Sequence, residues 1–138
     1  MAAPVRHLVL DNEAVSALLA TASKHAKRAQ VLEAIMAANG RTLVPTAVRC
    51  EARWDRTQQA SAAANLHVRE DDPLDALAAN RNVQLRTVVP AASLVDAAVV
   101  VSAERLPDGD VVEILTSDPR DIAALAGHAD ALIDVRAL

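Results

Sequence analysis

Five short, largely apolar runs alternate along this chain with longer segments of helical periodicity. They cover residues 7–10, 42–44, 66–69, 111–115 and 131–133. Short apolar runs without a clear alternation are typical of strands that are covered on both faces, as in a parallel sheet between helices. The sequence therefore predicts a three-layer α/β domain with a mainly parallel, short-stranded sheet flanked by helices. Because 138 residues suit one compact unit and no linker interrupts them, we expect a single domain over 1–138.

The segments between these runs predict helices. The first carries Val15, Leu18 and Leu19 at helical spacing, and the fifth, from Leu94 to Leu106, is apolar all round and is expected to be a buried central helix. The others are expected at 24–38 (with Val31, Ile35 and Ala38 inward), 46–59, 74–85 (with Leu74, Leu77, Val83 and Leu85 loosely periodic) and 122–126. Asp71, Asp72 and Pro73 are expected to form a turn.

Composition narrows the kind of core and the kinds of site. The chain has no Phe and no Tyr, so Trp54 is its one aromatic residue and aliphatic side chains must fill the core. Cys50 is the sole cysteine, which excludes an intramolecular disulfide and a thiolate-rich metal site; we expect it in the core. The formal charge of −4 argues only weakly against a nucleic-acid partner, because an acidic active site would itself contribute negative charge.

Targeting signals are not evident in the sequence. The N-terminus lacks the apolar core of a signal peptide, and no apolar run approaches the ~20 residues that cross a bilayer. We expect a cytoplasmic protein without a membrane partner.

Two acids come at the ends of predicted strands. Asp11 follows the first strand directly, and Asp118 lies just past the fourth. In an open α/β sheet the ligand crevice lies at the carboxyl ends of the strands, so these carboxylates are expected at one rim. Each also suits a helix N-cap, and Pro119 after Asp118 fits the first helical position, so capping is the simpler interpretation of either acid alone.

Two further acids fall within predicted helices. Glu51 shares a helix face with Ala47 and Trp54, where a buried carboxylate needs a metal, an arginine or a water-filled cleft. Asp96 opens the apolar helix, and its spacing from Ser93 also fits a capping box. The four acids together carry more weight than any one alone. Clustered carboxylates repel each other unless a cation neutralises them, and all-oxygen ligands favour Mg²⁺ or Mn²⁺. Such a site can activate water for phosphodiester cleavage.

The order of these motifs resembles the PIN-domain family, and most closely its bacterial VapC-type toxins, over nearly the whole chain. The matching segments are Leu8-Val9-Leu10-Asp11, Val44-Pro45 with Glu51, Leu94-Val95-Asp96-Ala97-Ala98, and Leu115-Thr116-Ser117-Asp118-Pro119-Arg120-Asp121.

The resemblance implies a function and a set of site residues. It implies a PIN-like fold, Mg²⁺- or Mn²⁺-dependent endoribonuclease activity on an RNA substrate, a homodimer, and inhibition by a cognate VapB-like antitoxin. It assigns the metal-binding and catalytic positions to Asp11, Glu51, Asp96 and Asp118, with support from Thr116 or Ser117. Asp121 matches a further acid that supports the site from outside the ligand shell or only caps the helix. One departure is Glu13, which stands where the family usually has a small or hydroxyl residue and could approach the metal or cap the helix.

RNA contacts would require cations near the acidic rim. Candidates are Arg49, Arg53 and Arg56 on the acid-bearing helix and Arg81 and Arg86 on a later one, although ion pairs with local acids explain each of them as well. An alternative function is a PIN-like module without turnover that binds RNA or a protein partner. A phosphoacceptor receiver domain is disfavoured because both lysines precede residue 28, and a hydrolase with an aspartate nucleophile is disfavoured because Glu13 replaces the second Asp it would need.

Overall fold

The structure is a computed structural model that describes residues 4–20 and 25–138. Its strands are β1 (Arg6–Leu10), β2 (Thr42–Pro45), β3 (Glu70–Asp72), β4 (Val111–Thr116) and β5 (Ile133–Ala137). Its α-helices are α1 (Asn12–Leu19), α2 (His25–Ala37), α3 (Thr46–Ala52), α4 (Ala62–His67), α5 (Ala76–Val88), α6 (Leu94–Glu104) and α7 (Pro119–Ala126), with a 3-10 turn at Gln59–Ser61.

All five strands form one parallel sheet in the order β3-β2-β1-β4-β5. This confirms the predicted fold class. The chain leaves β1 toward β2 on one side and later returns to place β4 on the other side, so the strand order reverses between β1 and β4. In register, Leu8 pairs with Glu113 and Leu10 with Leu115, which brings the carboxyl ends of these two strands together.

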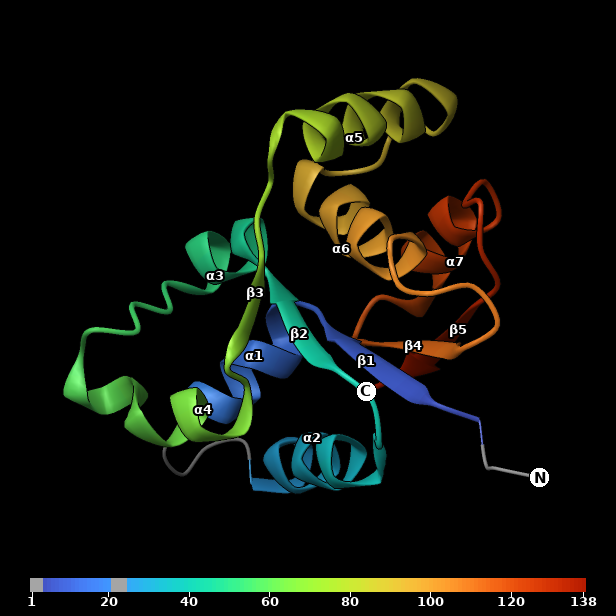
Figure 1. The fold of residues 1–138 in the computed structure, drawn as a ribbon. Coiled ribbons are helices and arrows are strands. Elements are labelled where there is room, and N and C mark those ends of the chain that lie inside the picture. Colours follow the sequence, from blue (N-terminus) through green and yellow to red (C-terminus); the bar gives the residue numbers. More distant parts are fainter. Residues whose placement is uncertain (1–3, 21–24) are drawn as a thin grey trace.

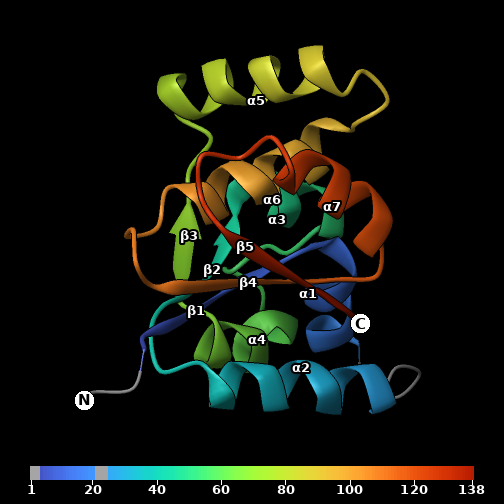
Figure 2. The same ribbon diagram turned by 90° about the vertical axis from the view of Figure 1, so that its right-hand side faces the viewer.

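Helices cover both faces of the sheet (Figures 1 and 2). Helices α1, α2 and α4 lie on one face, and α6 and α7 lie on the other, with α5 as an outer layer packed on α6. Helix α3 begins directly after β2 and contacts both α1 and α6. The beginnings of α1 and α7 therefore lie at the end of the sheet where the carboxyl ends of β1 and β4 meet, on the right in Figure 2.

Helix α6 is the buried central helix that the sequence predicts. Every residue from Ala97 to Ala103 is buried, because the sheet lies on one side and helices lie on the others. Alanine and valine let these neighbours approach closely, which is how a chain with one aromatic residue still fills its interior. The one buried hydroxyl in this stretch, Ser102, donates to Asp72 at 2.6 Å.

Between Ala52 and Val88 the structure corrects several predictions. Helix α3 ends at Ala52 instead of running to residue 59, because Arg53 adopts a left-handed backbone conformation (φ 57°). Residues 66–69 do not form a strand. Leu66 and His67 end helix α4, and the third strand consists of Glu70, Asp71 and Asp72, the last two of which were expected in a turn.

The inward face of α5 also differs from the expectation. Leu77 and Val83 are exposed (77% and 61%), whereas Ala78, Asn82 and Leu85 are buried against α6. The Asn82 amide is satisfied there by donating to the carbonyl oxygen of Leu94 at 2.9 Å.

Smaller differences concern the boundaries of one strand and one helix. The last strand runs from Ile133 to Ala137, two residues later than expected, and α2 starts at His25, since Lys24 lies outside the described residues. Within α2, Val31 and Ala34 are the buried positions, and Ile35 and Ala38 pack only partly against the core. Among the described helices, none is long and apolar enough to cross a bilayer.

Candidate metal centre

Asp11 lies at the junction of the two central strands. Its backbone N–H donates to the carbonyl oxygen of Leu115 (3.3 Å). One carboxylate oxygen accepts from the N–H of Ala14 (3.0 Å), which caps α1, and the other accepts from the N–H of Ser117 (3.2 Å). With only 6% of its surface exposed, Asp11 both caps a helix and ties the loop after β4 to the end of β1.

Asp118 occupies the N-cap position of α7, but its carboxylate makes no capping hydrogen bond. Its backbone N–H instead donates to Oγ1 of Thr116 (2.9 Å), a fully buried residue at the end of β4. Thr116 therefore fixes the turn that carries Asp118. Pro119 at the first helical position needs no N–H partner there.

Asp96 is the third residue of α6 and is half-buried. Oγ of Ser93 accepts from its backbone N–H (3.0 Å), so the spacing that suggested a capping box does form the serine half of one. The cap and the candidate site coincide at Asp96, because its backbone N–H serves the cap and its carboxylate lies near those of Asp118 and Asp121.

Three carboxylates meet at this edge of the sheet. One oxygen from each of Asp96, Asp118 and Asp121 lies within 4.8 Å of the others. We call these residues the acid cluster. Asp121 is the third residue of α7, so the members come from the first turn of α6, the N-cap of α7 and the first turn of α7. Helix N-termini carry partial positive charge, which partly offsets the repulsion.

The electrostatics of the acid cluster reflect crowding. Burial raises the pKa of the Asp96 carboxyl, and the negative charges of three neighbouring acids raise it further, in the order Asp118, Asp121 and Asp11, against the opposing effect of a hydrogen bond with Ser93. The pKa of Asp118 is raised first by its side-chain interaction with Asp121, then by burial and by the charges of Asp121 and Asp11, and the nearby backbone N–H of Asp121 opposes this rise. Metal-free, the cluster thus favours bound protons.

The donor set of the cluster fits a hard cation. Its ligand atoms are all carboxylate oxygens, the type that Mg²⁺ and Mn²⁺ prefer, whereas zinc sites favour nitrogen and sulfur. Two of the three side chains, Asp118 and Asp121, are exposed, so water and a large substrate can reach the site. Such a group could bind a divalent cation and bring it to a phosphate.

Glu51 lies outside this cluster. The expectation that its carboxylate would be buried is wrong, because Glu51 is exposed near the end of α3. The left-handed turn at Arg53 also takes Trp54 off the helix, so the two do not share a helix face. Its role as a metal ligand stays a prediction. Cys50, expected in the core, is likewise exposed.

Glu13, the departure from the family pattern, lies in the first turn of α1. Its carboxylate pairs with Lys27 of α2 at 3.1 Å, so it contributes to the contact between α1 and α2. Asp11, and not Glu13, is the N-cap of α1.

The candidate RNA-binding arginines on the acid-bearing segment have local partners. Arg49 and Arg56 both pair with Asp71, at 3.1 and 2.9 Å, and the Arg56 guanidinium lies 4.3 Å from the ring centre of Trp54. These contacts match the simpler alternative of ion pairs with local acids. Arg53 is exposed and, among the described residues, its side chain forms no hydrogen bond or ion pair.

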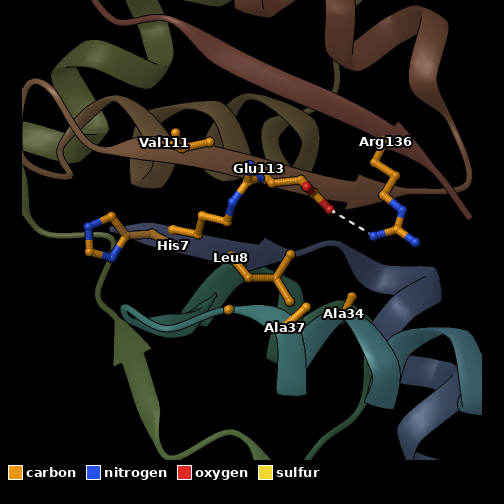
Figure 3. Close-up of a pocket in the computed structure, with 9 residues that line it drawn as sticks. His7, Leu8, Ala34, Ala37, Val111, Glu113 and Arg136 are labelled. Carbon is orange, nitrogen blue, oxygen red and sulfur yellow. Dashed lines mark hydrogen bonds and ion pairs between the residues drawn. The ribbon is translucent and has the colours of Figure 1, made fainter. Parts of the chain in front are cut away.

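A hollow of about 210 Å³ lies at the opposite end of the sheet, between α2 and strands β1, β4 and β5 (Figure 3). Glu113 of β4 and Arg136 of β5 line it and pair with each other at 3.3 Å, and Ala34 and Ala37 line its α2 side. Its lining includes Arg6 and Val111, the first residues of β1 and β4, and none of the acid cluster, so the two are separate.

The sequence predicted Asp11 and Asp118 at one rim, and the structure brings Asp96 and Asp121 to Asp118 there. It did not predict how Asp11 binds the loop after β4, because a hydrogen bond between residues more than 100 positions apart leaves no local sequence pattern. The bond from Asp118 to Thr116 spans two residues, and the hydroxyl at that position was its signal.

No protein-family model matches the sequence, and no curated protein is significantly similar to it. The fold, however, is similar to that of a chain in a crystal structure of VapBC2 from Rickettsia felis bound to a DNA fragment from their promoter. The TM-score is 0.54, the sequence identity is 9%, and the alignment covers 94% of this chain and 98% of the other. At this identity the similarity concerns the fold.

Proposed function

We propose that this protein is a PIN-like, Mg²⁺- or Mn²⁺-dependent endoribonuclease and the toxin of a VapBC-like toxin–antitoxin pair. The observation that carries the proposal is the acid cluster, in which Asp96, Asp118 and Asp121 offer three oxygens within 4.8 Å of one another. The cluster lies where the strand order reverses, which is the usual ligand position in open α/β sheets.

Each residue of the site has a distinct task in this proposal. Asp96, Asp118 and Asp121 would hold the cation. Asp11 adds negative charge beside them and keeps the loops after β1 and β4 together through Ser117. Thr116 sets the direction of Asp118. A bound divalent cation supplies an activated water and stabilises the charge that develops on the phosphate during phosphodiester cleavage.

The biological context of the proposal comes from the structural similarity. The similar structure is a VapBC2 complex with promoter DNA, and the alignment spans nearly all of both chains. We therefore propose a VapB-like antitoxin as the protein partner and RNA as the substrate. The homodimer and the cytoplasmic location implied by the resemblance belong to the same proposal.

Cleavage of RNA by purified protein in Mg²⁺, Mn²⁺ or EDTA tests the nuclease. Asp96→Asn removes one cluster charge and keeps the side-chain shape, and Asp108→Asn is the matched control, since Asp108 is exposed in the turn before β4. We expect metal-dependent cleavage by the wild type and the control, and none by Asp96→Asn. Equal activity of all three would indicate a contaminating nuclease and reject the proposal.

Titration of Mn²⁺ into the same proteins by calorimetry separates binding from turnover. Metal binding that Asp96→Asn weakens, without cleavage of any RNA, would favour the alternative of a PIN-like module that binds RNA or a protein partner. Absence of Mn²⁺ binding by the wild type would contradict the metal centre itself.

A further inference from the structure

We infer that Arg86 and Arg120 bind backbone phosphates on the two sides of the acid cluster and so determine how an RNA strand lies across it. The inference rests on the proposed function, because it names the groups that receive the substrate of that site. A strand of phosphates is repelled by three carboxylates, and cations beside the cluster would offset this repulsion.

Arg120 is the second residue of α7, between Asp118 and Asp121. Ile122 and Leu125 turn the buried face of α7 toward the core, and at about 100° per residue Arg120 stands on the other side of the helix. It is exposed, and its guanidinium has no hydrogen bond or ion pair within residues 4–20 and 25–138. A cation in the first turn also opposes the helix dipole, so Arg120 does not serve to stabilise α7.

Arg86 lies in the last turn of α5, and its guanidinium is anchored. Its Nε donates to the carbonyl oxygen of Ala92 at 3.2 Å. Ala92 directly precedes Ser93, the residue that caps α6 and receives the N–H of Asp96. The contact holds Arg86 beside the start of α6, while its two terminal nitrogens have no partner among the described residues. An arginine fixed through Nε presents these nitrogens as a fork for phosphate oxygens.

The two arginines are carried by two helices that pack against α6. Helix α5 lies on α6 as an outer layer and ends where α6 begins, and α7 lies beside α6 on the same face of the sheet (Figures 1 and 2). Asp96, in the first turn of α6, therefore has the end of α5 near it, and α7 brings Asp118 and Asp121 to it. A strand that runs from the end of α5 to α7 across the acid cluster would meet a cation at each helix.

Several other arginines are already engaged. Arg81, also on α5, binds Glu104 at 2.6 Å and the carbonyl oxygen of His128 at 2.9 Å. Arg49 and Arg56 pair with Asp71. Arg86 and Arg120 are thus the ones whose terminal nitrogens remain available on the two helices that flank α6.

The test measures binding of a fluorescein-labelled 12-nucleotide RNA by anisotropy in EDTA, between 50 and 200 mM salt, so that cleavage does not interfere. We expect Arg86→Gln and Arg120→Gln each to weaken binding about 3- to 10-fold and to reduce the slope of log K against log salt by about 0.7, the value for one phosphate contact on a single strand. Arg69→Gln is the matched control. Arg69 is also exposed without a side-chain partner among the described residues. It directly precedes β3 and so lies at the amino-terminal end of the parallel strands, whereas the acid cluster lies at their carboxyl-terminal end.

A third substitution separates phosphate binding from a structural role of Arg86. Arg86→Lys keeps the charge, so it should retain the salt slope and lose affinity less than Arg86→Gln. Unchanged affinity and slope in both glutamine variants, an equal loss in Arg69→Gln, or no RNA binding by the wild type would overturn the inference. These outcomes can be distinguished from failure of the proposed nuclease. Failure of the nuclease appears as absent Mn²⁺ binding or absent cleavage. If the wild type cleaves RNA but both glutamine variants bind RNA normally, only the proposal for the arginines is rejected.

Discussion

The carboxylate of Asp11 accepts a hydrogen bond from the backbone N–H of Ser117 across the two central strands, at 3.2 Å. A second bond, from Ala14 to the same carboxylate, caps helix α1. One buried side chain thus fixes the start of α1 and the loop that leads to Asp118. The geometry of the acid cluster therefore depends on a residue whose own oxygens are both engaged.

Substitution of Asp11 by alanine removes both bonds and should lower the free energy of unfolding by about 1–3 kcal/mol, from a lost cap and an unsatisfied amide. Asp11→Asn retains an N-cap acceptor and should lose less. Thermal unfolding followed by circular dichroism measures both. Equal stability of wild type and Asp11→Ala would show that the bonds contribute little.

Metal-free protein should become more stable when one cluster charge is removed. A raised pKa means that the folded protein holds the proton more tightly than the unfolded chain, where the carboxyl titrates near 3.8. The contribution of these protons to the free energy of unfolding is therefore complete below pH 3.8. It is lost as the pH rises through the raised pKa of the folded protein. At pH 7 in EDTA we expect Asp96→Asn to raise Tm by roughly 1–3 °C. The difference should vanish below pH 3, and a lower Tm at pH 7 would contradict it.

Divalent metal should reverse this order of stabilities. A cation that binds only the folded protein stabilises it by about 2.7 kcal/mol at 100 times its Kd. Mn²⁺ should raise the Tm of the wild type and of Asp108→Asn, and should raise that of Asp96→Asn less. A shift of the same size in all three proteins would mean that Mn²⁺ binds outside the acid cluster.

Glu51 provides a direct test of the family pattern against the geometry. Since Glu51 is exposed and lies outside the acid cluster, Glu51→Gln should reduce Mn²⁺ affinity by less than Asp96→Asn does. Calorimetric titration of both variants under the same conditions decides this. An equal loss would place Glu51 among the ligands, as the resemblance implies, and would require α3 to move when metal binds.

Gly40 should not tolerate a side chain. A Cβ there would lie 2.6 Å from Nδ1 of His7 and 2.8 Å from the carbonyl oxygen of Arg6. His7 cannot easily move, because its Nδ1 accepts from the N–H of Arg41 (2.9 Å) and its Nε2 faces Asp110 (2.7 Å). We expect Gly40→Ala to cost about 1–3 kcal/mol in chemical denaturation. Gly127→Ala, with no contact closer than 3.6 Å, is the control and should change stability by less than about 0.5 kcal/mol.

The elements that bury aliphatic side chains could be predicted from the sequence. The strand at 111–115 and the helix from Leu94 are both present, because each is surrounded by the core and its composition reports that directly. The segment from Ala52 to Val88 could not be read this way. Strand β3 is an edge strand of three acids without an apolar pattern, and α5 turns Ala78 and Asn82 inward while Leu77 faces water.

The candidate site was predicted in part. The rule that carboxyl ends of neighbouring parallel strands meet was sufficient for Asp11 and Asp118. It was not sufficient for Glu51, which is exposed near the end of α3, or for the early end of that helix at the left-handed residue Arg53. The left-handed backbone conformation is uncommon for arginine, so the residue type does not predict it. Capping and site roles also coincide at Asp96, and sequence spacing alone could not separate them.

Strand β3 consists of three carboxylates, and each has a partner on another segment. Glu70 pairs with Arg41, Asp71 with Arg49 and Arg56, and Asp72 accepts from Ser102. A short edge strand whose side chains are charged is a poor template for a strand from another molecule. This side of the sheet is therefore protected against lateral growth into aggregates, in a protein whose core strands are otherwise almost entirely aliphatic.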